Sequence, residues 1–122
     1  MVEMKHADMT ERIIRCAIDV HKGLGPGLAR EIYGKALAIE LERSGLAYTA
    51  DVAVKVVYAD VVLGERRIPF VVSDVVVVVP QITEIDDAAI ASSVALLRGS
   101  GKAVGLILNF ARARLDIRRI AN

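Results

Sequence analysis

The segment Ser73-Asp-Val-Val-Val-Val-Val-Pro80 decides the fold of this chain of 122 residues. Its five consecutive valines favour a β-strand, because β-branched side chains fit a pleated sheet better than a helix. An apolar run without alternation predicts a strand that is covered on both faces, and Pro80 ends it because proline has no N–H to donate. We therefore expect a buried strand over residues 75–79, which follows a tight turn at Ser73-Asp74.

Helices and further strands surround this segment in the order α-α-β-β-β-α-β-β. Helical periodicity predicts helices over residues 10–24 and 28–44, and a third that begins at Asp86 or Asp87. The remaining strands are predicted over residues 52–57, 67–72, 103–109 and 113–120, with turns at Asp60 and Gly64-Glu65. The expected fold is a single α/β domain over residues 1–122, a mixed sheet flanked by helices, with residues 1–9 as a loose N-terminus.

Local signals predict where the helices begin and end. Thr10 is a candidate N-cap of the first helix, and the Gly25-Pro26-Gly27 segment ends that helix. Gly45 is the expected C-terminal stop of the second helix. The apolar side chains of the second helix are expected to point inward; they are Leu28, Ile32, Tyr33, Ala36, Leu37 and Leu41.

The composition combines high apolarity with balanced charge. Hydrophobic residues make up 54% of the chain, the mean hydropathy is +0.45, and the net charge is +1. This balance excludes a disordered chain and argues against a nucleic-acid binder that depends on bulk positive charge. The apolar excess indicates either a well-filled core or apolar surface that is kept for partners.

The sequence shows no signal for export or for membrane insertion. Acidic residues occur early in the N-terminal segment, and no apolar run approaches the roughly 20 residues that a spanning helix needs. Cys16 is the single cysteine, so we expect a buried, inert thiol and no disulfide within the chain. We expect a cytoplasmic protein that contacts no membrane and uses no cofactor.

Several motifs resemble those of a known family in their order and spacing. They are Gly23-Leu-Gly-Pro-Gly-Leu-Ala-Arg-Glu-Ile-Tyr33, the following stretch from Ala36 to Leu41, and Gly105-Leu-Ile-Leu-Asn-Phe110. From about Thr10 to Ile120 the chain resembles the bacterial GxxExxY proteins, a branch of the PD-(D/E)xK nuclease superfamily. The resemblance implies a restriction-endonuclease-like sandwich and a metal-dependent phosphodiesterase ancestry. Such chemistry uses two or three carboxylates to hold Mg²⁺ and a lysine near the attacking water.

The residues that the resemblance assigns to catalysis are all replaced in this chain. The family's helix glutamate, strand aspartate, strand glutamate, lysine and helix glutamine fall on Arg30, Pro69, Val79, Gln81 and Ser92 or Ser93, respectively. Mg²⁺ prefers oxygen ligands, which the side chains of proline and valine do not supply. The resemblance therefore implies a degenerate nuclease fold, a pseudoenzyme without catalytic or metal-binding residues. Gly25, Pro26, Gly27 and Tyr33 remain from the family motif, and we interpret them as structural.

Two charged clusters each have a functional and a structural interpretation. Glu84, Asp86 and Asp87 could form a relocated metal site, but capping of the third helix is the simpler interpretation. The second cluster is a basic strip on the last predicted strand, made of Arg112, Arg114, Arg118 and Arg119. This strip could contact phosphate or another subunit, and a solvated edge strand is the structural interpretation.

We expect a non-enzymatic protein that uses this fold for self-association or scaffolding, as a homodimer or larger assembly paired through its valine-rich strands and its last strand. Two alternatives remain open. One is a nucleic-acid binder that keeps phosphate contacts through Arg30, Arg66, Arg67 and the terminal arginines without cleavage. The other is a metal-dependent nuclease with relocated ligands such as Glu31, Glu65, Asp74 or Glu84.

Overall fold

Three helices and five strands follow one another in the order that the sequence predicts. The computed structural model describes residues 2–122, with side chains from Ala7 onward. The helices are α1 (Val2–Leu24), α2 (Arg30–Arg43) and α3 (Asp87–Ser100). The strands are β1 (Tyr48–Tyr58), β2 (Val61–Val72), β3 (Val75–Val78), β4 (Val104–Asn109) and β5 (Asp116–Ala121).

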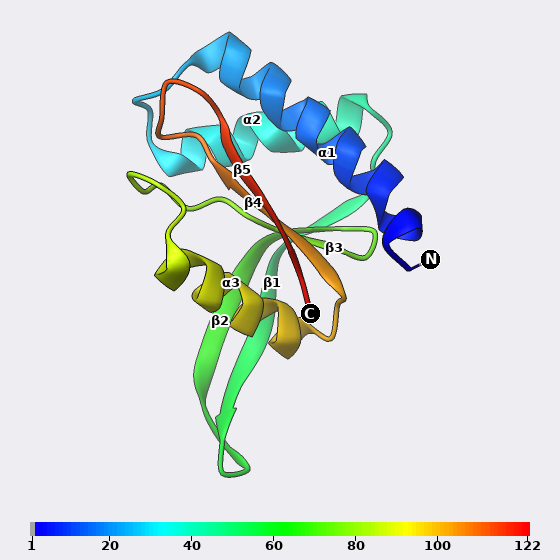
Figure 1. Cartoon of the computed structure of the whole chain (residues 1–122), viewed down its shortest axis with the longest axis vertical. Coiled ribbons are helices and arrows are strands. Elements are labelled where there is room, and N and C mark those ends of the chain that lie inside the picture. Colours follow the sequence, from blue (N-terminus) through cyan, green and yellow to red (C-terminus); the bar gives the residue numbers. More distant parts are fainter. Residues whose placement is uncertain (1) are drawn as a thin grey trace.

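The strands form one mixed sheet in the order β1-β2-β3-β4-β5. Strands β3 and β4 pair in parallel across the α3 crossover, and the other neighbours are antiparallel. Helices α1 and α2 cover one face of the sheet and α3 covers the other (Figure 1). This is the predicted α/β sandwich.

The valine strand lies in the middle of the sheet, and both of its faces are covered. Val75 and Val77 belong to the core under α1 and α2, whereas Val76 and Val78 belong to the core under α3. The prediction of a strand buried on both faces is therefore confirmed. The expectation that this strand offers a free sheet edge is wrong, because β2 and β4 pair with its two sides.

The turn between α1 and α2 is tied to the core through Tyr33. Gly25 and Gly27 have φ angles of +68° and +98°, which glycine adopts without steric cost. The Tyr33 hydroxyl donates a hydrogen bond to the carbonyl of Gly25 and accepts one from the N–H of Leu28. Its ring stacks on Phe110 with a centroid distance of 4.8 Å. The aromatic ring thus joins the turn to the end of β4.

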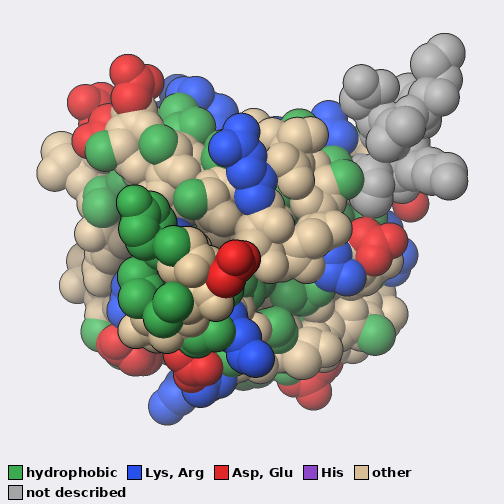
Figure 2. Space-filling view, turned by 90° about the horizontal axis from the view of Figure 1, so that it is seen from below, with side chains coloured by type: hydrophobic (Ala, Val, Ile, Leu, Met, Phe, Trp, Pro, Cys, Tyr) green, Lys and Arg blue, Asp and Glu red, His purple; other side chains and the backbone are tan. Residues whose placement is uncertain are grey.

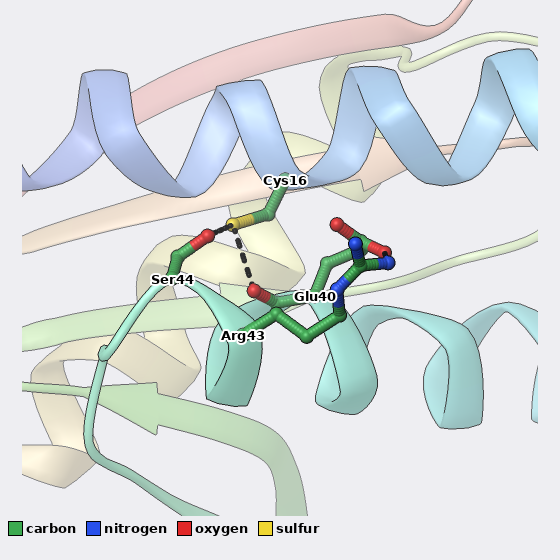
Figure 3. Close-up of polar contacts among 4 residues, drawn as sticks. All are labelled: Cys16, Glu40, Arg43 and Ser44. Carbon is green, nitrogen blue, oxygen red and sulfur yellow. Dashed lines mark hydrogen bonds and ion pairs between the residues drawn. The ribbon is translucent and has the colours of Figure 1, made fainter.

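Cys16 lies buried between α1 and the C-terminal end of α2, as predicted. Its Sγ atom lies 3.4 Å from Ser44 Oγ and 3.6 Å from the carbonyl oxygen of Glu40 (Figure 3). An exposed ion pair of 3.3 Å between Arg43 and Glu40 lies beside it. The thiol is therefore a packing contact between two helices.

Three predictions about the helices are wrong. Helix α1 begins at Val2, so Thr10 is not an N-cap; its hydroxyl donates to the carbonyl of Ala7 one turn earlier. Residues 2–9, which we expected to be loose, continue this helix, while Met1 lies outside the described residues. In α2, Ile32 is 44% exposed, because it points away from the side on which Tyr33, Leu37 and Leu41 are buried.

The β1–β2 hairpin is longer than predicted. Its turn lies at Ala59-Asp60, where both residues have positive φ angles, as a two-residue turn of type I′ requires. Gly64 and Glu65 lie within β2 opposite Val56 and Lys55, so the turn predicted there is wrong. The hairpin consequently extends as an arm beyond α3 (Figure 1).

The hydroxyl of Tyr33 is expected to stabilise the fold measurably. We expect Tyr33→Phe to lower the free energy of unfolding by about 1–2 kcal/mol, because two partly buried backbone groups lose a partner. Tyr58→Phe is the matched control: Tyr58 is exposed on the arm, so its hydroxyl should have little effect. Urea denaturation followed by circular dichroism measures both; equal stability of the two variants would contradict this role.

Candidate functional site

A cleft of about 600 Å³ lies where the start of α2, the strands β1 to β3 and helix α3 meet. Among its lining residues are those to which the resemblance assigns the family's catalytic positions: Arg30, Pro69, Val79, Ser92 and Ser93. Positions far apart in the sequence thus converge on one hollow. Gln81 lies beside it, in an adjoining hollow with Arg30 and Glu31, and its amide donates to the carbonyl of Leu28.

Three arginines line the cleft, and two of them are held by neighbouring groups. Arg66 donates to the carbonyl oxygen of Ser92 at 3.1 Å and to its Oγ at 2.9 Å, which links β2 to α3. Arg67 donates to Glu65 at 2.7 Å and to the carbonyl of Asp51 at 3.2 Å. The third arginine, Arg30, is exposed in the first turn of α2. The side chains that face the cleft are therefore more basic than acidic.

The residues of the cleft do not fit the Mg²⁺ ion that such a nuclease would use. Glu31 and Asp51 are the carboxylates among its lining residues, and the Asp51 carboxylate lies 3.8 Å from Arg67. Val79, where a carboxylate would have to reach the ion, is buried in the core at 5% exposure. In the part of the chain whose side chains are described, no group of three His, Cys, Asp or Glu residues could hold a metal ion.

Glu31 lies closer to this site than the sequence suggests. One step along a helix turns the side chain by about 100°, which by itself would separate Glu31 from Arg30. Both residues nevertheless line the cleft, since they lie in the first turn of α2, at the end of the helix that opens onto it.

The other acidic candidates are dispersed over the surface. Glu65 binds Arg67, and Asp74, in the β2–β3 turn, lies 3.6 Å from the ammonium group of Lys102. Asp86 caps α3 by accepting a hydrogen bond of 2.9 Å from the N–H of Ala89, so the predicted cap is confirmed. Glu84 and Asp87 are exposed beside it.

The terminal arginines do not form a single strip on one strand. Strand β5 begins at Asp116, so Arg112 and Arg114 lie in the preceding loop rather than in the strand. Arg118 and Arg119 are consecutive strand residues, whose side chains point to opposite faces of the sheet. All four arginines are exposed, and β5 is an edge strand. Both observations agree with the interpretation of this segment as a solvated edge strand.

The structure shows an apolar surface that the sequence reasoning missed. At the end of the β1–β2 arm, large side chains are between 39% and 74% exposed; we call this set the arm tip, and it consists of Val56, Val57, Tyr58, Val61, Val62 and Leu63. Figure 2, which views the molecule from the arm's end, shows hydrophobic side chains gathered there among charged ones. The sequence does contain a signal for this surface, since an apolar run lies on each side of Ala59-Asp60. The turn wrongly predicted at Gly64-Glu65 kept the second run from being recognised as part of a strand.

None of the helices that the structure describes is both long and apolar enough to cross a membrane.

The hydrogen bond from Tyr48 to Glu42, outside the cleft, raises the pKa of the Tyr48 phenol.

The relationship to known proteins rests on one comparison. The family model of the PD-(D/E)XK nuclease superfamily matches residues 7–120. No curated protein and no solved structure matches the chain significantly. The match includes all three helices from Ala7 onward and the whole sheet up to Ile120, including every residue that lines the cleft. The chain therefore belongs to the PD-(D/E)XK nuclease superfamily.

Proposed function

We propose that this protein is a non-enzymatic member of the superfamily, a degenerate relative of the GxxExxY branch, which acts by associating with further copies of itself. The observation that carries the proposal is the arm tip, six large apolar side chains exposed on an extended hairpin. Exposed apolar side chains gathered at one end of a molecule are typical of protein–protein contact sites. A net charge of +1 provides little repulsion between copies.

The chemistry of the cleft supports the absence of catalysis. Hydrolysis of a phosphodiester in this superfamily depends on carboxylates that hold a divalent cation, and Pro69 and Val79 occupy two of the positions concerned. Arg30 at a third position would repel such a cation. Glu31 and Asp51 alone do not make up the oxygen-rich ligand set that Mg²⁺ requires.

The exposed apolar surface lies on the arm tip and not on the valine strand, where the sequence analysis expected it. The valine strand uses its side chains within the core, under the chain's own helices. The arm tip has no such cover among the described residues, so it is the apolar surface left for a partner.

Self-association is expected to be visible in the concentration dependence of the mass. In sedimentation equilibrium, the average mass should rise above 13.2 kDa as the protein is concentrated from the low micromolar to the high micromolar range. Because the contact is mainly apolar, added salt should not dissociate the assembly. A single monomeric species at every concentration would refute the proposal.

Cleavage activity is expected to be absent. Single-stranded DNA, double-stranded DNA and RNA should remain intact with Mg²⁺ or Mn²⁺, and titration of either metal should release no heat of binding. The variant Glu31→Gln/Asp51→Asn removes the carboxylates of the cleft and serves as the control. Cleavage by the wild type that is lost in this variant would show a working site with relocated ligands, contrary to the proposal.

Phosphate binding without cleavage is the second candidate, since Arg30, Arg66 and Arg67 line the same cleft. If it holds, a fluorescent oligonucleotide should bind at low salt and dissociate steeply as salt is raised. Arg30→Glu should abolish that binding, whereas Arg118→Glu on β5 should reduce it much less. No change in anisotropy at low salt would exclude this function.

A further inference from the structure

We propose that the cleft of one copy receives the arm tip of a second copy. This inference rests on the proposed self-association and names the surface that the arm tip contacts. Over residues 56–63, which carry the arm tip, Asp60 is the one charged residue, and it lies at the turn with a φ angle of +62°. The cleft combines apolar side chains with three arginines. The two surfaces therefore match in chemistry, and both belong to the same chain.

The arm of each copy extends away from that copy's own cleft. The residues from Asp51, which lines the cleft, to Asp60 at the turn span roughly 30 Å in an extended strand. Helix α3 packs against the arm at Val54, so closely that a Cβ atom on Gly99 would lie 2.7 Å from Val54 Cγ1. Beyond this contact the arm continues past α3 (Figure 1). An arm fixed in this direction reaches the cleft of another copy but not its own.

The charge of Asp60 is complementary to that of the cleft. Three arginines against two carboxylates leave the lining residues with one net positive charge. Arg66 and Arg67 are engaged by neighbouring groups, whereas no ion pair among the described residues involves Arg30. A carboxylate that enters the cleft can therefore accept hydrogen bonds from the Arg30 guanidinium, and bonds between charged groups are stronger than neutral ones.

The apolar part of the cleft suits the side chains on either side of the turn. Pro69, Pro80 and Ile82 line the cleft and are only half-buried, so they keep apolar surface in contact with water. A volume of about 600 Å³, the size of a pocket that encloses a small ligand, accommodates the few side chains of a hairpin turn. Tyr58 and Val61, which flank the turn, are 74% and 56% exposed. Docking removes both apolar surfaces from water, which is the main favourable term in association.

This contact is not symmetric, because the arm of one copy meets a different surface of the next. After a first contact, one arm and one cleft of the pair are still unused. Association of this kind continues from copy to copy until a ring closes or a filament forms.

Mixing two variants tests whether the arm and the cleft meet. Tyr58→Ser/Leu63→Ser removes apolar side chains of the arm tip and keeps the cleft, whereas Arg30→Glu keeps the arm and places a carboxylate where Asp60 would bind. Each variant alone should self-associate roughly tenfold more weakly than the wild type. The equimolar mixture should form a complex of two chains, because one variant supplies an intact cleft and the other an intact arm. Sedimentation equilibrium measures the mass in each case.

Matched variants show whether the effects are specific to these two surfaces. Arg118→Glu reverses a charge on β5, and Ile39→Ser removes an exposed apolar side chain of α2. Both lie outside the arm and the cleft, so both should associate as the wild type does. Asp60→Asn removes only the charge and keeps a residue type that tolerates a positive φ angle, so it should weaken association by about two- to fivefold. Circular dichroism verifies that each variant is folded.

The outcomes separate this inference from the proposed function. A wild type that remains monomeric at every concentration refutes both. If the wild type associates while Arg30→Glu associates equally well, or if the mixture associates no better than its two components, the cleft is not the partner of the arm. Self-association then stands through another surface.

Discussion

The burial of the valine strand is the constraint on which the rest of the structure depends. Each of Val75, Val76 and Val77 is fully buried, and a buried valine contributes about 1.5–3 kcal/mol relative to exposure in water. Successive side chains point to opposite faces, so this burial requires a layer of helices on each side. The parallel pairing of β3 with β4 requires a crossover, and α3 is that crossover and also the second layer.

The same strand bears on the proposal that the cleft holds no metal ion. Val79 lies at its end, where a carboxylate would need to turn toward the ion, and instead it packs with the core under α1 and α2. A side chain cannot fill the core and ligate a hydrated cation at the same position. The polar groups that remain at the cleft bind one another, as Arg66 does with Ser92 and Arg67 with Glu65 and Asp51.

The two edges of the sheet differ in their chemistry. Strand β5 carries Arg118 and Arg119, and charged side chains on an edge discourage pairing with another chain. Strand β1 carries opposite charges on either side of a central alanine and ends in apolar side chains. The two edges of the sheet therefore expose different side chains, arginines on β5 and apolar residues at the end of β1.

The predictions that succeeded depend on residues close together in the chain. The five valines, the cap at Asp86 and the stop at Gly45 follow from side-chain shape and from local hydrogen bonds, so the element order could be predicted. The wrong predictions share a different cause. Thr10 and Gly64-Glu65 have the local features of a helix start and a turn, but the helix and strand around them continue through both. In β2, pairing of Gly64 and Glu65 with Val56 and Lys55 outweighs the local preference for a turn, whereas in α1 the helix simply runs on through Thr10.

The sequence by itself determined the fold class and the buried strand, because both depend on the type and order of residues along the chain. Only the tertiary structure decided that Arg30, Pro69, Val79 and Ser92 face one cleft, and that Glu31 joins them. It also decided that the valines are internal while the arm tip is exposed. Apolar residues in both places look alike in the sequence. Which of them is covered depends on where α3 ends relative to the hairpin, and that is a property of packing in three dimensions.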